Sequence, residues 1–151
     1  MPALWPCPRR ARATVPTTTR PRTAVAEPPS GTEKRRAAFR SGLAAEDRAA
    51  TLLEARGFEV LGRRVRTKAG EIDLVARLGD LLVFCEVKLR AGLDDAAFAV
   101  LPRQRRRIAA AAEAYLAAHP EYDGMNLRFD AVLLARTGAA EHLPGAFEAE
   151  G

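Results

Sequence analysis

Apolar residues recur at helical spacing in two segments of the chain. The first segment predicts a helix over residues 36–56, followed by the stop signal Gly57. Its expected buried stripe is Phe39, Leu43, Ala45, Ala49, Leu52 and Leu53. The second predicts a helix that begins at Pro102, a residue suited to a first helical turn, and ends near His119-Pro120. Its expected buried stripe is Ile108, Ala111, Ala112, Tyr115 and Leu116.

Between and after these helices the pattern is that of strands. Alternation and turn signals predict strands at 58–66, 71–77 and 81–90, the last being the most apolar and so expected at the centre of the sheet. A short helical turn is expected at 94–100, a fourth strand at 127–134 and an edge strand at 142–147. The order α-β-β-β-α-β-(β) predicts an α/β domain with a mixed sheet.

Composition separates a tail from this domain. Residues 1–35 are rich in Pro, Thr and Arg without apolar periodicity, so we interpret them as disordered and residues 36–151 as the domain. Residues 1–40 carry nine basic and two acidic residues, whereas residues 41–151 carry fifteen basic and seventeen acidic ones. A nucleic-acid surface on the domain must therefore be a local patch. The tail faintly resembles an organellar transit peptide. The preferred interpretation is a solvated tail, or a sequence read from an upstream start codon that was chosen in error.

Uninterrupted apolar runs such as that from Leu81 to Cys85 are far short of the ~20 residues that cross a bilayer, so no membrane partner is expected. Cys7 and Cys85 form neither a disulfide framework nor a zinc motif, which favours a reduced, cytoplasmic protein.

Two neighbouring strands carry the candidate chemistry. Asp73 is expected to share a strand face with Glu71 and Val75, while Glu86 and Lys88 lie two residues apart on the next strand. The turn at Gly79-Asp80 joins the two strands as a hairpin, which should bring Asp73 close to Glu86.

Paired carboxylates repel unless a partner compensates them, and a divalent cation that prefers oxygen, Mg²⁺ or Mn²⁺, would do so. Asp73, Glu86 and the backbone carbonyl of Val87 are the expected donors, with Lys88 orienting or deprotonating the attacking water. The alternative is that Lys88 only neutralises the carboxylates in an ion-pair network.

The Asp, hairpin and Glu-x-Lys arrangement resembles the PD-(D/E)xK nuclease signature, and residues 39–147 resemble the YraN-like family of small bacterial proteins. The matching blocks are Gly42-Leu-Ala-Ala-Glu46-Asp-Arg-Ala-Ala, Gly70-Glu-Ile-Asp73-Leu-Val-Ala, Val83-Phe-Cys-Glu86-Val-Lys88-Leu-Arg90, Arg128-Phe-Asp130-Ala-Val and His142-Leu-Pro-Gly-Ala-Phe147. The resemblance implies a restriction-endonuclease-like fold, shared with archaeal Holliday-junction resolvases. It also implies that Glu46, on the first helix, joins the metal site. The chain departs from the family at Arg64, Gln104 and Cys85, where Asn, Lys and Val are usual.

Four arginines, Arg103, Arg105, Arg106 and Arg107, crowd the first turns of the second helix. Positive charge there opposes the helix dipole, so phosphate contacts are the favoured interpretation over a solvated basic face. Arg90 follows the Glu-x-Lys strand and is expected to touch the same backbone. Tyr115 is expected in the core, Asp130 in a pair with a nearby Arg, and His142 at the surface or an edge.

These observations predict a Mg²⁺- or Mn²⁺-dependent nuclease acting on DNA, with branched or structured DNA as the suggested substrate. The alternatives are a non-catalytic nucleic-acid-binding module on the same fold and an interaction protein whose charged strand is structural. A homodimer would suit symmetric cutting of two strands.

Overall fold

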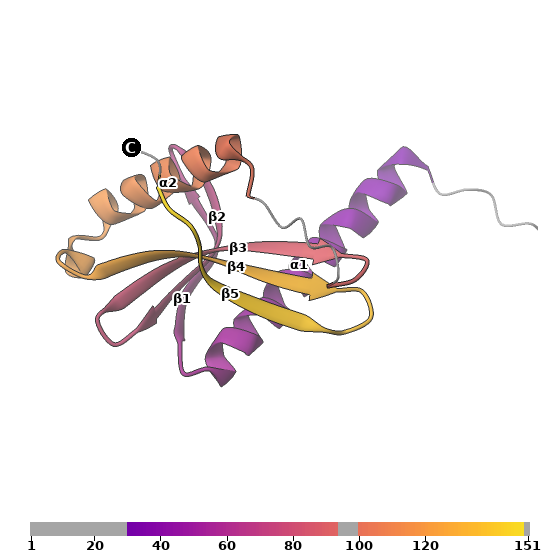
Figure 1. Cartoon of the computed structure of the whole chain (residues 1–151). Coiled ribbons are helices and arrows are strands. Elements are labelled where there is room, and N and C mark those ends of the chain that lie inside the picture. Colours follow the sequence, from indigo (N-terminus) through magenta and orange to yellow (C-terminus); the bar gives the residue numbers. More distant parts are fainter. Residues whose placement is uncertain (1–29, 94–99, 150–151) are drawn as a thin grey trace, which may run out of the picture.

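A five-stranded sheet lies between two helices in the computed structural model, which describes residues 30–93 and 100–149 (Figure 1). The elements in chain order are α1 (Gly31–Ala55), β1 (Glu59–Thr67), β2 (Gly70–Leu78), β3 (Leu81–Arg90), α2 (Pro102–Ala118), the 3₁₀ turn η1 (Pro120–Tyr122), β4 (Asn126–Ala135) and β5 (Ala140–Phe147). This order confirms the predicted α/β class and is consistent with the restriction-endonuclease-like fold that the resemblance implied.

The strands follow one another across the sheet in sequence order, from β1 to β5. Neighbouring strands are antiparallel except for β3 and β4, which are parallel. β3 and β4 are parallel because the segment that connects them, which contains α2, carries the chain back to the end of the sheet at which β3 began. β3 is the central strand, as its apolar sequence predicted.

The two faces of the sheet bury two separate cores. On one face α1 packs Ala45, Ala49, Ala50 and Leu53 against residues of β2, β3 and β4 that include Leu74, Val83, Cys85 and Val132. On the other face α2 packs Ala111, Ala112 and Tyr115 against Ile72, Val75, Leu82 and Phe84. Small alanines on both helices allow a close approach to the sheet, and the strands supply the larger side chains.

α1 begins five residues earlier than predicted, because Ser30 and Glu33 form a reciprocal capping box. The Ser30 hydroxyl accepts the Glu33 N–H at 3.3 Å, and the Glu33 carboxylate accepts the Ser30 N–H at 2.7 Å. The first part of the helix extends past the sheet (Figure 1). Consequently Phe39 and Leu43, predicted to be buried, are 56% and 37% exposed.

The structure describes only part of the predicted tail and of the predicted turn at 94–100. Most of the expected tail and most of the expected turn at 94–100 lie outside the described residues, although Val100 is described and buried. Within residues 30–93 and 100–149, no helix has both the length and the apolar character needed to cross a membrane.

Candidate active site

Asp73 lies where the backbone pairing of β2 and β3 stops. The register runs from Leu78 opposite Leu81 to Leu74 opposite Cys85. One residue further, the Asp73 carboxylate accepts a hydrogen bond from the Val87 N–H at 2.8 Å. The Asp73 side chain therefore accepts a hydrogen bond from β3 at a level where a backbone carbonyl of β2 would do so in a regular ladder. This places the Asp73 carboxylate beside the Glu86–Lys88 segment.

The strict alternation predicted for β2 fails next to Asp73. Ile72 and Val75 pack in the same core under α2, whereas Leu74 packs on the α1 side. Asp73 and Val75 therefore do not simply share a face, as the period of two had predicted. The expected proximity of Asp73 to Glu86 nevertheless holds, because both lie at this interruption of the sheet.

The surroundings of Asp73 oppose its ionisation. Burial is the largest cause and the neighbouring Glu86 carboxylate adds to it, so the pKa of Asp73 rises to about 6. The hydrogen bond from Val87 and the Lys88 ammonium act in the opposite direction without cancelling the rise. Asp73 is thus a carboxyl group whose charged form lacks full compensation in the protein alone.

Glu86 is almost completely buried, with 3% of its surface exposed, and two cations approach its Oε1 atom. Lys88 Nζ donates to it at 2.5 Å, and Arg107 Nη2 from α2 lies 3.8 Å away. Glu86 and Lys88 do share one face, as their spacing predicted. Arg107, predicted only as a phosphate contact, reaches the carboxylate at the centre of the site.

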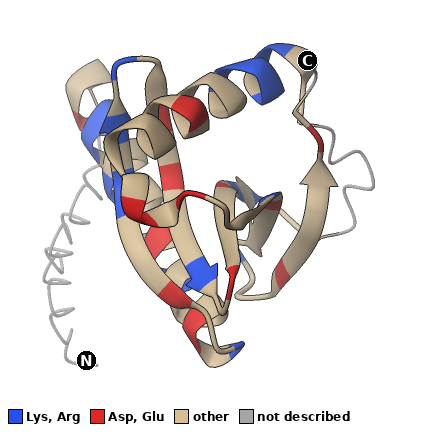
Figure 2. Ribbon diagram, turned by 90° about the vertical axis from the view of Figure 1, so that its left-hand side faces the viewer, with Lys and Arg blue, Asp and Glu red and all other residues tan. Residues whose placement is uncertain are grey.

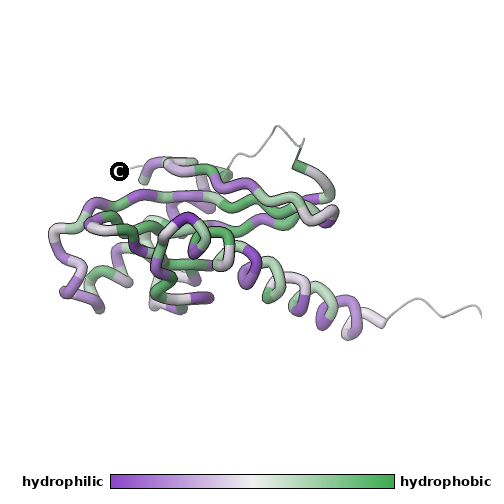
Figure 3. Tube along the Cα trace, turned by 90° about the horizontal axis from the view of Figure 1, so that it is seen from below, coloured by the Kyte–Doolittle hydropathy of each residue, from purple (hydrophilic) through white to green (hydrophobic). Residues whose placement is uncertain are grey.

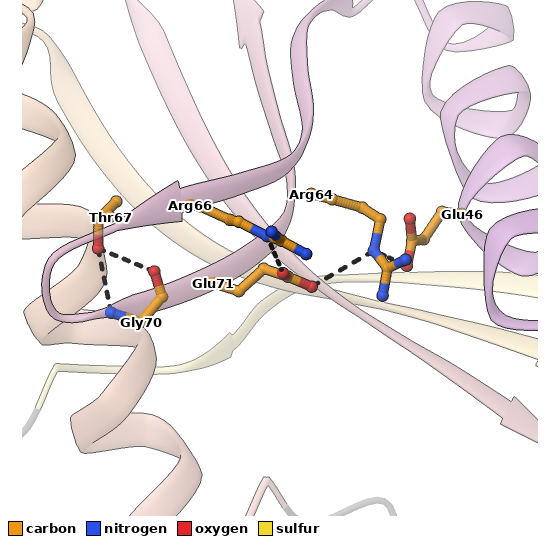
Figure 4. A network of polar contacts seen from close by, with 6 residues as sticks. All are labelled: Glu46, Arg64, Arg66, Thr67, Gly70 and Glu71. Atoms are coloured by element: carbon orange, nitrogen blue, oxygen red, sulfur yellow. Dashed lines mark hydrogen bonds and ion pairs between the residues drawn. The ribbon is translucent and has the colours of Figure 1, made fainter. Parts of the chain in front are cut away.

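Glu46 on α1 belongs to a chain of charges that Figure 4 shows. Asp73 lies within electrostatic range of Glu46. Arg64 Nε lies 3.3 Å from Glu46 Oε1 and 3.3 Å from Glu71 Oε1, and Arg66 Nε lies 3.2 Å from Glu71 Oε2. Burial raises the pKa of Glu46, Arg64 lowers it, and Asp73 raises it again. Glu46 is therefore within electrostatic range of Asp73, while its carboxylate pairs with Arg64.

The sequence did not single out Arg64 and Glu71 as site residues. Arg64 has a positive φ of 48°, a conformation that Asn adopts more readily than Arg. The signal that was available was the family's usual Asn at this position, because Asn is a residue that favours such a left-handed backbone.

Gly70 lets α2 approach the start of β2. Its φ is 151°, and a Cβ atom at this position would lie 3.3 Å from Cγ of Arg107. The absence of a side chain at Gly70 therefore leaves room for the Arg107 stem on its way to Glu86.

The other predicted nucleic-acid residues lie around this centre. The arginines of α2 colour its first turns blue in Figure 2, close to the C label. Arg90, Arg103 and Arg106 are exposed. Arg105 is half-buried, and its Nε donates to the Val100 carbonyl at 2.7 Å, so this arginine also anchors the start of the helix.

A second polar cluster lies on β4 and β5. His142 is on the edge strand β5, one of the two places expected for it, but its side chain is buried and its Nε2 lies 2.6 Å from Asp130 Oδ2. Asp130, which is fully buried, pairs with Arg128 through two contacts of 2.7 and 2.8 Å, as predicted, and accepts the Gly145 N–H. These bonds hold the pKa of Asp130 at about 2 despite its burial. His119 ends α2 and Tyr115 is buried, as predicted.

The donor chemistry at Asp73 and Glu86 fits a hard divalent cation. A buried carboxyl with a raised pKa beside a second carboxylate is a pair whose repulsion such an ion relieves. Mg²⁺ is commonly held by one or two carboxylates, with water and substrate phosphates completing its shell. Across the described residues, side chains of His, Cys, Asp and Glu do not gather in groups of three or more that could hold a metal ion.

Comparison with known proteins places this site within one family. The family model described as "Uncharacterised protein family UPF0102" matches residues 45–134, a range that contains Glu46, Asp73, Glu86, Lys88 and Arg107. A UPF0102 protein of Azorhizobium caulinodans is 63% identical over 127 residues, which cover 82% of this chain and 97% of that protein.

Two further relatives match nearly the same share of this chain at lower identity. A UPF0102 protein of Rhodopseudomonas palustris is 57% identical over 81% of this chain and 90% of its own length. One of Bradyrhizobium diazoefficiens is 53% identical over 82% of this chain and 93% of its own length. The chain therefore belongs to the UPF0102 family of YraN-like proteins.

Proposed function

We propose that this protein is a metal-dependent nuclease that hydrolyses phosphodiester bonds in DNA. The observation that carries the proposal is the meeting of Asp73 with the Glu86-x-Lys88 segment at the end of the β2–β3 ladder. Two carboxylates and an ammonium group converge there, and the carboxylates are partly removed from water.

In this proposal Asp73 and Glu86 hold a Mg²⁺ or Mn²⁺ ion, with the Val87 carbonyl as a further oxygen donor and Glu46 in support. When bound, the ion would neutralise charge on the scissile phosphate and lower the pKa of a bound water. Lys88, whose ammonium group lies beside Glu86, orients the attacking water, or deprotonates it after giving up its own proton and becoming the neutral amine. Arg107 helps to neutralise Glu86 and lies close enough to the site to contact a phosphate.

DNA as the substrate is supported by the charges around this centre. Arg103 and Arg106 are exposed on the first turns of α2, and Arg90 is exposed at the end of β3, two residues beyond Lys88. Neutralisation of phosphates by such side chains supplies most of the affinity of sequence-independent binding. Branched or otherwise structured DNA is the substrate form that we would test first beside linear duplexes.

The test is cleavage of labelled linear, flapped and four-way DNA with Mg²⁺ or Mn²⁺. The wild-type protein is compared with Lys88→Ala and with Lys68→Ala, which removes the same charge from the β1–β2 turn. We expect cleavage that needs the metal, a loss of about 100-fold or more in Lys88→Ala, and near wild-type rates in Lys68→Ala. Full activity in Lys88→Ala, or cleavage that persists with chelator, would rule out this mechanism.

A second candidate is a non-catalytic nucleic-acid-binding module. Its specific support is that Glu86 already has a close ion pair with Lys88 and a second cation, Arg107, at 3.8 Å. In that case Lys88 compensates a buried carboxylate and serves no water. This candidate predicts salt-sensitive DNA binding that survives Asp73→Ala, with no cleavage of any substrate.

A further inference from the structure

The first part of α1, residues 31–44, extends past the sheet as a helical arm (Figures 1 and 3). Residues 31–41 are all exposed, and burial against the sheet begins only at Ala45. Four basic residues stand on this arm, Lys34, Arg35, Arg36 and Arg40, against the single acidic residue Glu33. Glu33 lies at the start of the arm, where it forms the capping box with Ser30, so residues 34–44 carry only positive charges.

One face of the arm is continuous with the face that carries Glu46. At 100° per residue, Glu46 and Phe39 project within about 20° of each other, and Arg35 and Arg36 flank Phe39 at about 40° and 60°. A surface hollow on this face confirms the grouping, since its lining is Thr32, Arg35, Arg36, Phe39 and Arg40. Lys34 projects about 140° away from Phe39.

Contacts at the inner end of the arm connect this face to the candidate active site. The Arg64 guanidinium lies 5.0 Å above the Phe39 ring, and the same group lies 3.3 Å from Glu46 Oε1. Asp73 in turn lies within electrostatic range of Glu46. The basic face therefore leads along α1 from an exposed end toward the carboxylates of the site.

We propose that this face of the arm, formed by Arg35, Arg36 and Phe39, binds the backbone of duplex DNA whose neighbouring segment lies in the active site. The inference rests on the proposed function for the position of the DNA, but it assigns a separate binding surface. Eleven residues separate Arg35 from Glu46, about 16 Å along the helix axis, which corresponds to about five base-pair steps. A rigid helix of this length suits a duplex, which is itself straight over such a distance.

The charge of this face favours duplex DNA over a second copy of the chain as its partner. A symmetric dimer formed through this face would bring its basic residues close to those of the second copy. Such like charges repel, whereas a polyanion complements them. Duplex DNA is therefore the favoured partner, and self-association becomes an outcome that the experiment must detect.

The test measures binding of the full chain to a short labelled duplex over a series of salt concentrations, in the Lys88→Ala background so that no cleavage intervenes. Arg35→Ala and Arg36→Ala are each compared with Lys34→Ala, the matched control on the opposite side of the same helix. We expect each arginine variant to weaken binding about three- to tenfold and to reduce the salt slope by about one. Lys34→Ala is expected to change the affinity by less than about twofold.

Equal losses in Lys34→Ala, wild-type affinity in both arginine variants, or a dimer that dissociates in Phe39→Ala would each overturn the proposal. A separate cleavage assay, on protein that retains Lys88, tests the proposed nuclease independently of the arm. Cleavage by the wild type together with unchanged binding in the arginine variants would reject the arm and keep the nuclease. Arm-dependent binding without cleavage would keep the arm and reject the nuclease. If both hold, the loss in the arginine variants is expected in KM rather than in kcat.

Discussion

The Asp73 carboxylate accepts the backbone N–H of Val87 at 2.8 Å, just beyond the last paired residues of β2 and β3. This bond fixes an acidic side chain against the strand that carries Glu86 and Lys88. It also leaves Asp73 with a pKa of about 6, because one N–H and a nearby ammonium do not offset burial and the second carboxylate. The site is therefore under electrostatic strain in the protein alone, and this strain has measurable consequences.

Asp73→Asn should stabilise the metal-free protein at neutral pH. The pKa of Asp73 is raised from 3.8 to about 6 on folding, so the folded state binds more protons between these values and stability falls as pH rises through this window. An amide at this position has no charge to desolvate, and its oxygen still accepts the Val87 N–H. We expect a gain of about 1–3 kcal/mol in unfolding free energy at pH 7 and almost none below pH ~4, measured by urea denaturation with chelator present.

Divalent metal should reverse the order of stability of the wild type and Asp73→Asn. Mn²⁺ is expected to raise the melting temperature of the wild type and to have little effect on Asp73→Asn, because the variant has lost a charged ligand of the proposed metal site. A wild type that is already more stable than Asp73→Asn at pH 7 without metal would contradict the strain at Asp73.

Arg64→Asn should raise the pKa of Glu46 further above its ordinary value. Burial already raises this pKa, and the guanidinium 3.3 Å away is the group that lowers it. Asn also suits the positive φ at this position, so the backbone should tolerate the change. The measurement is an NMR titration of the Glu46 carboxyl. Arg66→Asn is the control, because Arg66 pairs with Glu71 and its loss should leave Glu46 nearly unchanged.

Gly70→Ala should destabilise the protein and displace Arg107. The new Cβ would lie 3.3 Å from the Arg107 Cγ atom at a backbone φ of 151°, so we expect a loss of about 1–3 kcal/mol. Gly79→Ala is the control, since its φ is also positive but no atom lies within 4 Å of a Cβ there.

A double-mutant cycle identifies the cause of the Gly70→Ala loss. In the Arg107→Ala background the crowded side chain is absent, so Gly70→Ala should cost less by about 0.5 kcal/mol or more. Strict additivity of the two substitutions in urea denaturation would show that the backbone, and not Arg107, causes the loss.

Asp130 should support stability above about pH 4 and lose this contribution in acid. Its pKa falls from 3.8 to about 2 on folding because His142, Arg128 and the Gly145 N–H all bond to the charged form. The stabilisation is therefore complete above the unfolded pKa of 3.8 and disappears as the pH falls through about 2. Asp130→Ala should lose about 3–5 kcal/mol at pH 7, because it leaves buried partners without their carboxylate.

Urea denaturation of Asp130→Ala at pH 7 and at low pH tests both statements. The destabilisation relative to wild type should shrink in acid, where the wild type has lost the same charge. Glu121→Ala, which removes an exposed carboxylate beside His119, should change stability little at either pH. A pH-independent cost of Asp130→Ala would contradict the assigned role of the charge.

The sequence alone determined the elements of the domain and the meeting of its two central strands. Short-range periodicity of 3.6 and 2 residues specified the helices and strands, and the turn at Gly79-Asp80 made one hairpin of β2 and β3. Because a hairpin fixes its own register, Asp73 was bound to lie near Glu86, and Lys88 to share the face of Glu86. These relations depend on residues close in sequence, and for that reason a pattern was enough to predict them.

The tertiary structure alone decided which long side chains meet. The burial of His142 against Asp130, the reach of Arg107 to Glu86 and the position of Arg64 between Glu46 and Glu71 all join different elements. The exposure of Phe39 has the same origin, since α1 is longer than the sheet that it covers. A period along the chain specifies the face of an element, but packing in three dimensions decides what that face contacts and where the contact ends.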